Sequence, residues 1–415
     1  MIQSANKDNI ERILRNIDRF QTGVGEGTTR VLFTEPELAA REYVKNEMKA
    51  LGLEVKEDAI GNIFGTLKGS DPSLSPVWTG SHIDTVLNAG MFDGMAGVVC
   101  GLEAVRLIIV NGIKPKRDIS VIVYTSEEPT RFGLSCIGSR ALAGVLSLED
   151  TKELTDKDGK NLYTLLDELG YKHDEFCDIM KQNGDVYASV ELHIEQNDVL
   201  EKENIPIGIV KGICAPTNFS VTVKGVQGHA GGSPMSERKD AFMAAAELAL
   251  VLEDAAKKSE SEYITATVGK VDVFPNAVNV ISGDTHMSID IRSIDMAAKD
   301  VIIETLKYET GRIEKARGVE IDLHLENHDR PLKCDEKIIN LEKDVCRCLN
   351  TDYKEMISGP YHDSLFVGRF APASMIFVPS KKGISHSKDE WTDFSQLAVG
   401  TDVLAETLFE LSNQS

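Results

Sequence analysis

The 415-residue sequence has no long uncharged apolar run and no excess of basic side chains. No segment approaches the ~18 apolar residues that a membrane-spanning helix requires, and residues 1–20 are charged and helical in pattern rather than signal-like. The formal net charge is −21, because 45 Lys and Arg stand against 66 Asp and Glu, which argues against nucleic acid or an anionic membrane as a partner. We therefore expect a cytoplasmic protein that acts on a small, soluble molecule.

The sequence also lacks paired cysteines, internal repeats and low-complexity tracts. Its seven cysteines are scattered and odd in number, and none are spaced as in a zinc ribbon, so we expect free thiols that mostly pack in the interior. A chain of 415 residues is too long for one ordinary core, which predicts two domains.

Segments with helical and strand-like periodicity alternate in the N-terminal half, and polar residues follow directly after several apolar strands. This order predicts an α/β domain with functional groups at the carboxyl ends of its strands. From about residue 213 the pattern changes to β-α-β-β-α-β, which predicts an inserted α+β domain of the ferredoxin-like type. The α/β pattern then resumes, so we expect residues 1–212 plus 330–415 to form one domain and residues 213–329 the other.

Acidic residues and a histidine cluster after two of the apolar strands. The motif TGSHIDTVLNAGMFDG places His82, Asp84 and Asp93 after one strand, and DISVIVYTSEE ends in Glu127 and Glu128. Carboxylate oxygens and imidazole nitrogens are the ligands that divalent first-row metals prefer, and one carboxylate can bridge two ions. The pattern indicates a metal-dependent hydrolase.

Each motif also has a structural alternative. A lone His-Xaa-Asp is more often a strand-end histidine with a capping aspartate, but the acidic residues nearby and His193, which another strand delivers, favour metal binding. In an extended segment His82 and Asp84 point to the same side, whereas in a loop Asp84 could support the imidazole. Glu127 and Glu128 cannot share one orientation in a strand, so one could ligate metal while the other takes a proton from water. A solvated acidic strand end is the alternative for this pair.

Seven motifs, in order along nearly the whole chain, resemble a known family. They are TGSHIDTV, MFDGMAGV, TSEEPTRFG, ELHIEQ, GVQGHAGGSPM, FPNAVNVI with IDIRSID, and GISHSKDEWT. Together they resemble the carbamoylase and allantoate amidohydrolase branch of the dinuclear metallopeptidase-like amidohydrolases, which includes N-carbamoyl-L-amino acid hydrolase, allantoate amidohydrolase, ureidoglycolate amidohydrolase and β-ureidopropionase. The resemblance implies a metallopeptidase-like catalytic domain whose insert serves as a lid and dimerisation domain.

The resemblance implies two divalent ions that share one carboxylate. It assigns the first ion to His82, Asp93 and His193, and the second to Asp93, Glu128 and His386. Asp93 is then the bridge, and His193 stands where the carboxypeptidase branch uses an acidic ligand. Such ligands suit zinc, manganese, cobalt and nickel alike.

The resemblance also assigns roles to residues that do not bind metal. Glu127 resembles the general base and later the proton donor to the leaving nitrogen, and Asp84 the residue that orients His82. His229, flanked by glycines that permit close approach, resembles an oxyanion stabiliser that reaches the site from a lid or a partner subunit.

Three further side chains are expected to bind substrate. Arg292 offers a planar fork for a carboxylate, and Asn279 and Gln196 offer amide groups for a ureido or carboxylate head. The alternative for Arg292 is a surface ion pair with Asp290 or Asp295. His362 occupies the place of a Gly-His-Asp-Ala stretch in relatives and is also expected at the substrate, although the sequence here is GPYHDSLFVGR, in which Pro360, Tyr361 and Ser364 replace small residues.

These assignments predict a homodimeric hydrolase of carbon–nitrogen bonds other than peptide bonds, in linear amides. We expect it to cleave the ureido group of a small carboxylate, with N-carbamoyl-L-amino acids as the first candidate and allantoate as the alternative. A dipeptidase or aminoacylase with the same metal core is a candidate from another class, and it would release no ammonia. A non-catalytic binding protein is disfavoured, because every expected ligand and the base are present.

Overall fold

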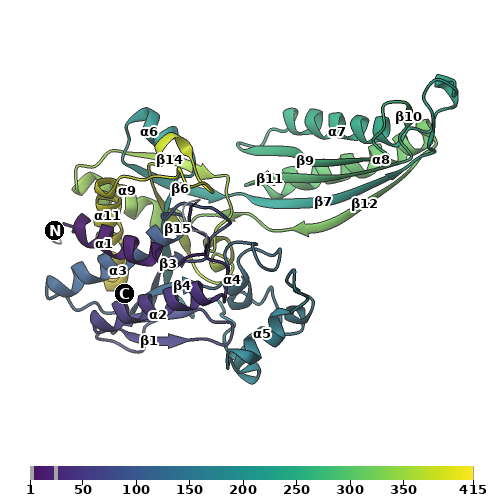
Figure 1. Cartoon of the computed structure of the whole chain (residues 1–415). Coiled ribbons are helices and arrows are strands. Elements are labelled where there is room, and N and C mark those ends of the chain that lie inside the picture. Colours follow the sequence, from purple (N-terminus) through teal and green to yellow (C-terminus); the bar gives the residue numbers. More distant parts are fainter. Residues whose placement is uncertain (1–3, 23–26, 415) are drawn as a thin grey trace. The chain divides into compact units, whose positions relative to one another are not determined.

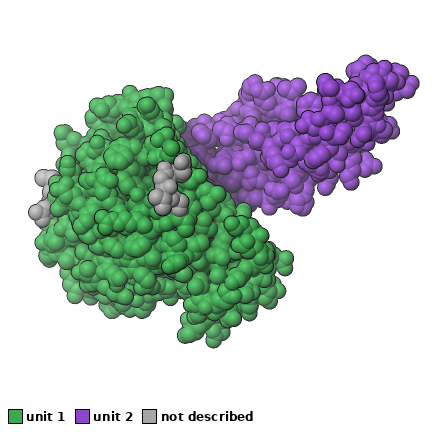
Figure 2. All heavy atoms as spheres, viewed as in Figure 1, with its two compact units in different colours: residues 1–211, 334–356, 362–415 green, residues 212–333, 357–361 purple. Residues whose placement is uncertain are grey.

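The computed structural model describes residues 4–22 and 27–414, and the chain separates into two compact units (Figure 2). The first comprises the residues up to 211, residues 334–356 and those from 362 onward, and the second comprises residues 212–333 and 357–361. The sequence predicts divisions at 212/213 and 329/330, whereas in the structure residues 212, 330–333 and 357–361 also belong to the second unit.

A nine-stranded sheet of the described chain is formed mostly by residues of the first unit (Figure 1). Its strand order is β1-β2-β4-β3-β5-β15-β6-β13, with β14 beside β6. The four central strands β4, β3, β5 and β15 are parallel, and the outer pairings β1–β2, β2–β4, β15–β6 and β6–β13 are antiparallel. The strands are β1 (Glu54–Glu57), β2 (Ile63–Leu67), β3 (Val77–His82), β4 (Ile119–Tyr124), β5 (Ala188–Ile194), β6 (Ile207–Ile213), β13 (Leu332–Lys333), β14 (Tyr353–Ser358) and β15 (Ala373–Val378).

Helices pack against this sheet, and α1, α3 and α11 contact one another as one layer. In the part of the chain that the structure describes, no helix is both long and apolar enough to cross a membrane. The helices are α1 (Lys7–Asp18), α2 (Glu35–Ala50), α3 (Met95–Val110), α4 (Ile137–Leu142), α5 (Leu162–Glu168), α6 (Val199–Glu203), α9 (Glu336–Cys348), α10 (Ser364–Val367) and α11 (Phe394–Asn413).

The central strands are buried along their whole length, because helices cover both faces of a parallel sheet. Their apolar sequences, such as ISVIVY in β4, therefore run continuously instead of alternating. The loops that follow β3, β4, β5 and β15 leave from the carboxyl ends of parallel strands, and these ends lie along one edge of the sheet. Polar residues in these loops are thereby brought together.

The second unit is a four-stranded antiparallel sheet in the order β12-β7-β11-β9, with α7 and α8 packed on one face (Figure 1). Along β11 burial alternates at every residue, so Ile289 and Ile291 face the helices while Asp290 and Arg292 lie on the open face. This β-α-β-β-α-β order agrees with the predicted α+β fold. The elements are β7 (Ala215–Lys224), β8 (Gly228–His229), α7 (Ala241–Lys257), β9 (Ile264–Phe274), β10 (Val280–Ile281), β11 (Asp284–Ser293), α8 (Met296–Arg317) and β12 (Glu320–His328).

Candidate metal centre and active site

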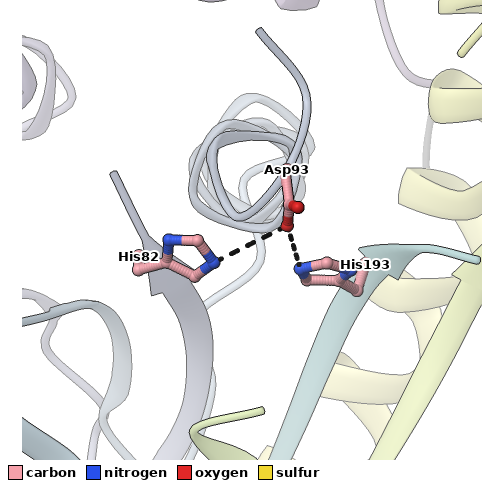
Figure 3. Close-up of side chains that lie close together, drawn as sticks. All are labelled: His82, Asp93 and His193. Carbon is pink, nitrogen blue, oxygen red and sulfur yellow. Dashed lines mark ion pairs between the residues drawn. The ribbon is translucent and has the colours of Figure 1, made fainter. Parts of the chain in front are cut away.

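The ligands expected from the sequence lie at the carboxyl ends of the parallel strands. His82 is the last residue of β3, His193 lies near the end of β5, and Asp93 lies in the loop that leads into α3. Their side chains point toward one another in Figure 3, with Asp93 between the two imidazoles. Glu128 follows β4 and His386 follows β15.

These residues form two groups that share Asp93. The potential ligand atoms of His82, Asp93 and His193 lie within 4.8 Å of one another, as do those of Asp93, Glu128 and His386. Asp93 Oδ1 is 3.2 Å from His193 Nε2 and 3.8 Å from His82 Nε2, whereas Asp93 Oδ2 is 3.2 Å from His386 Nε2. The two oxygens of one carboxylate therefore face two different groups of ligands.

Backbone carbonyls orient the two buried imidazoles. His82 Nδ1 is 2.9 Å from the carbonyl oxygen of Asp84, and His193 Nδ1 is 2.9 Å from that of Ile194. A carbonyl only accepts, so each Nδ1 carries a hydrogen, and Nε2 is the atom directed at Asp93. This is the second-sphere arrangement that metal-binding histidines commonly have, and it fits both residues to a divalent ion.

Asp84 does not orient His82 through its carboxylate, in contrast to the role expected from the sequence. Its Oδ1 is 3.8 Å from His82 Nδ1, which is too far for a hydrogen bond. Instead Oδ1 accepts the backbone N–H of Glu127 at 3.2 Å, and Oδ2 accepts that of Glu128 at 3.1 Å. The carboxylate of Asp84 therefore holds the glutamate pair, and its backbone carbonyl orients the imidazole.

The site gathers more buried carboxylates than the protein can keep ionised without a cation. Burial and the Glu128 carboxylate raise the pKa of Glu127 well above its ordinary value, and burial together with Asp93 raises the pKa of Glu128 to about 8. Burial also disfavours ionised Asp93, but the imidazoles of His193 and His386 hold its pKa well below the usual range. A divalent ion supplies the positive charge that this set requires, so the donors fit a metal on electrostatic grounds as well.

Gly94 makes room for the first group of ligands. It has a φ of +70°, and a Cβ atom at this position would lie 2.4 Å from Nε2 of His82. Any larger residue would therefore displace the imidazole as well as strain the backbone.

Gln196 and His362 lie close to the ligands, but in different ways. The Nε2 of Gln196 donates to Asp93 Oδ2 at 2.8 Å, and its Oε1 is buried without a hydrogen-bond partner among the described residues. The Oε1 atom can therefore accept a hydrogen bond from an N–H group of a bound small molecule. His362 is only 2% exposed, and its ring packs edge-on against His193 with centroids 4.5 Å apart. It therefore packs against one of the expected metal ligands.

The other expected substrate residues belong to the second unit. The backbone N–H of Gly231 donates to His229 Nδ1 at 3.0 Å, so Nε2 carries the hydrogen and the exposed ring presents an N–H donor. Asn279 is exposed on the neighbouring loop, and its carbonyl accepts the N–H of Ala230.

Arg292 forms the ion pair that the sequence analysis kept as an alternative. Its Nε and Nη2 donate to the two oxygens of Asp290 at 3.0 and 3.1 Å. This pair occupies one edge of the guanidinium. The other edge, formed by Nη1 and the second hydrogen of Nη2, has no hydrogen-bond partner in the described part of the chain and can still bind a carboxylate.

Sequence reasoning missed the buried polar residues that support the ligands. Glu191 accepts hydrogen bonds from Ser81 at 2.8 Å and from Ser364 at 2.6 Å, and it forms a third potential ligand group with His193 and His362. Glu390 contacts the loop that bears Asp93. The one available signal was position, because Glu191 lies two residues before His193 and Glu390 four residues after His386.

A cluster of imidazoles and carboxylates at the carboxyl ends of parallel strands is typical of metal-dependent hydrolases. Comparison with known proteins agrees, because the pattern of Peptidase family M20/M25/M40 matches residues 78–410, and the chain belongs to this family. Within it the chain is an amidohydrolase of the carbamoylase and allantoate type, which acts on linear amide carbon–nitrogen bonds other than peptide bonds.

Three similar proteins illustrate this placement. The ureidoglycolate hydrolase of Oryza sativa subsp. japonica is 41% identical over 98% of this chain and 85% of its own. The N-carbamoyl-L-amino-acid amidohydrolase of Paenarthrobacter aurescens is 35% identical over 98% of both chains. The crystal structure of AtUAH in complex with (S)-hydroxyglycine has a TM-score of 0.85 at 39% identity, over 99% of this chain and 98% of the other. The family expected from the motifs is thereby confirmed.

Proposed function

We propose that this protein hydrolyses the ureido group of a small carboxylate with the help of two divalent metal ions. The observation that carries the proposal is the Asp93 carboxylate, whose two oxygens face two separate ligand groups. Bridging carboxylates of this kind bind two metal ions at once in hydrolases that act on amides and phosphates. When bound, the ions polarise the scissile carbonyl and lower the pKa of water. Zinc, manganese, cobalt and nickel all suit these ligands.

Glu127 is the proposed general base. It is 7% exposed, and its Oε2 lies 3.7 Å from His82 Nε2, beside the first ligand group without belonging to either group. The hydrogen bond from the backbone N–H of Glu127 to Asp84 Oδ1 fixes the position of the Glu127 main chain. From this position Glu127 takes a proton from the attacking water and then delivers it to the leaving nitrogen.

The proposed substrate contacts follow from the donors and acceptors that are still available. The Oε1 of Gln196 accepts an N–H of the ureido group, and Arg292 grips the substrate carboxylate with its outer guanidinium edge. His229 donates from Nε2 to the developing oxyanion, because its Nδ1 is already an acceptor. Asn279 is proposed to contribute its side-chain amide.

Ureidoglycolate is the first substrate to test. The two ureidoglycolate hydrolases compared are 41% and 40% identical to this chain, whereas the N-carbamoyl-L-amino-acid amidohydrolase of Paenarthrobacter aurescens is 35% identical. N-carbamoyl-L-amino acids, the first candidate from sequence, and allantoate are the alternatives. All three carry both a ureido group and a carboxylate, so the same catalytic residues would serve each of them.

The test is an assay panel with the metal-loaded enzyme and ammonia detection. Ureidoglycolate, an N-carbamoyl-L-amino acid, allantoate and a dipeptide are compared at equal concentration. We expect ammonia from at least one ureido substrate and a kcat/KM for it that exceeds that for the dipeptide by about a hundredfold or more, since specificity for buried polar groups reaches this scale. Turnover of the dipeptide alone, without ammonia, would identify a peptidase instead.

A homodimer is proposed through the second unit. In the described sheet the outer edge of β9 pairs with no strand, and Val271 and Phe274 on it are about half exposed, as is Phe242 on α7. Lys270 and Asp272 flank Val271, so an antiparallel copy centred on Val271 would place opposite charges across the interface. Light scattering at micromolar concentration should give twice the chain mass of 45.5 kDa, and Val271→Lys should give the monomer.

The same dimer offers a test of where His229 acts. Chains with His229→Ala and chains with Glu127→Gln are inactive alone under this proposal. If His229 serves the partner's site, mixed dimers contain one intact site and recover part of the activity. A dimer without complementation would assign His229 to the site of its own chain.

A further inference from the structure

Glu390 contacts two of the three loops that carry ligands of the second group. It lies four residues after His386 and is only 4% exposed. Its Oε1 accepts the backbone N–H groups of Phe92 and Asp93, each at 3.0 Å. Its Oε2 lies 3.0 Å from the hydroxyl of Ser385, the residue directly before His386. One buried carboxylate thus joins the loop after β3 to the loop after β15.

Two further contacts tighten this connection. The hydroxyl of Ser385 is also 3.0 Å from Asp93 Oδ2, so it lies between the carboxylates of Glu390 and Asp93 and donates its single hydrogen to one of them at a time. A Cβ atom at Gly90 would lie 2.4 Å from both the Cβ and the Oε1 of Glu390, so the backbone of the first loop packs directly on the glutamate. The two loops are therefore in contact at the place where Glu390 lies.

The position of His386 depends on this contact between the loops, whereas His82 and His193 are held by the strands that carry them. Its side chain is 51% exposed, whereas His82 and His193 are 1% exposed at the ends of central strands. Its backbone has a φ of +54°, which is uncommon for a residue other than glycine. Packing cannot fix an exposed imidazole, so the position of His386 is set by how its loop is held.

We propose that Glu390 is a positioning residue that fixes the distance between Asp93 and His386 and thereby the affinity of the second ion-binding group. This inference rests on the proposed two-ion function. Glu390 binds no metal in this account and acts through the backbone of Asp93 and the hydroxyl of Ser385. The first group should be less affected, because strands β3 and β5 hold His82 and His193 independently of the loop after β15.

The experiment titrates the metal-free full-length protein with Mn²⁺ and records both affinity and the electron paramagnetic resonance spectrum. We expect the wild type to bind two Mn²⁺ per chain with an exchange-coupled spectrum. Glu390→Ala should bind the first ion within about threefold of wild type and the second at least about tenfold more weakly, the scale for losing an outer-sphere support. At stoichiometric Mn²⁺ its spectrum should be that of isolated ions.

Two conservative variants and a control separate positioning from a general loss of packing. Glu390→Gln keeps an oxygen for the two backbone N–H groups and offers an N–H to Ser385, so it should restore the coupled spectrum. Glu390→Asp keeps the charge but is one methylene shorter, so it should weaken the second ion as Glu390→Ala does. Glu103→Ala removes another buried carboxylate, which accepts the N–H of Asn6, and should leave both ions bound as in wild type.

The outcomes are distinct. Unchanged affinities and an unchanged coupled spectrum in Glu390→Ala would overturn the inference, and Glu390→Asp decides in the same way if the alanine variant does not fold. Binding of fewer than two Mn²⁺ by the wild type would instead contradict the proposed two-ion function.

Discussion

The Oδ1 atom of Asp84 accepts the backbone N–H of Glu127 at 3.2 Å, so the loop after β3 holds the loop after β4 at the active site. The neighbouring Oδ2 does the same for Glu128. The sequence motifs predict that Asp84 orients the imidazole of His82, but its carboxylate positions Glu127, the proposed base, and Glu128, a proposed metal ligand. The imidazole of His82 is oriented by the backbone of Asp84, which no substitution removes.

Asp84→Asn tests this relationship. Asparagine has one carbonyl oxygen, so its amide would face one of the two N–H groups of the glutamate pair. We expect kcat/KM to fall by about tenfold to a hundredfold, the scale for losing a charge-assisted hydrogen bond, while metal content is kept. Metal analysis beside kinetics checks this. Loss of the first ion with the second ion retained would show that the carboxylate supports His82 after all, because Glu128 belongs to the second group only.

The bridging role of Asp93 predicts a difference in metal content among ligand variants. Asp93→Ala removes a ligand from both groups, so both ions should be lost after dialysis. His386→Ala removes a ligand from the second group only and should retain one ion per chain. His193→Ala should lower metal content and activity together. Equal metal content in Asp93→Ala and His386→Ala would contradict a shared carboxylate.

The free edge of the Arg292 guanidinium predicts that a lysine at this position cannot bind the substrate carboxylate as arginine does. Arg292→Lys keeps the charge but loses the fork, so KM should rise by about tenfold or more. Arg312→Lys, a change in an exposed ion pair on α8, is the matched control and should leave KM unchanged. Substrates amidated at the carboxylate should be poor for the wild type. Equal rates on acid and amide would exclude a carboxylate anchor.

The buried Glu342, which belongs to none of the potential ligand groups, predicts how the stability of the protein depends on pH. Burial raises the pKa of Glu342 from 4.5 to about 8, although Ser374 donates a hydrogen bond to it. The folded state thus keeps the proton while the unfolded state releases it, so stability present below pH 4.5 is lost as pH rises toward 8. Gln cannot ionise, so Glu342→Gln should gain stability relative to wild type between pH 5 and 8, by about 1 kcal/mol or more.

Urea unfolding at several pH values measures this gain. The exposed Glu410→Gln is the control for removing one charge. A stability difference between Glu342→Gln and wild type that does not change with pH would contradict a neutral, buried Glu342.

The sequence predicts the elements with strong periodicity and misses those defined by distant partners. The strand at 77–82 and the long strands and helices of the second unit follow from apolar runs and alternation, because each buries a continuous or alternating face. The strands β6 and β14 were not predicted, since their place depends on pairing beside β15. Residues 357–361 also belong to the second unit, which depends on tertiary contacts and is not indicated by the local sequence.

The same distinction applies to the site. The proposed ligands follow from residue type and family motifs, and the structure brings all five together. The hydrogen-bond partners of these side chains do not follow from the sequence, because they depend on the geometry of the loops. Asp84 therefore holds Glu127, Arg292 is already paired with Asp290, and Glu390 joins two loops that are almost three hundred residues apart in sequence.

Glu127→Gln with simultaneous metal analysis tests the central claim most directly. Glutamine nearly matches glutamate in size and shape, and Glu127 belongs to neither ligand group, so the variant should keep both ions. Because Gln cannot accept the proton, turnover of the ureido substrate should fall by at least about a hundredfold. Full metal content with this loss is the predicted result. Near-normal turnover in Glu127→Gln with both ions bound would contradict the account.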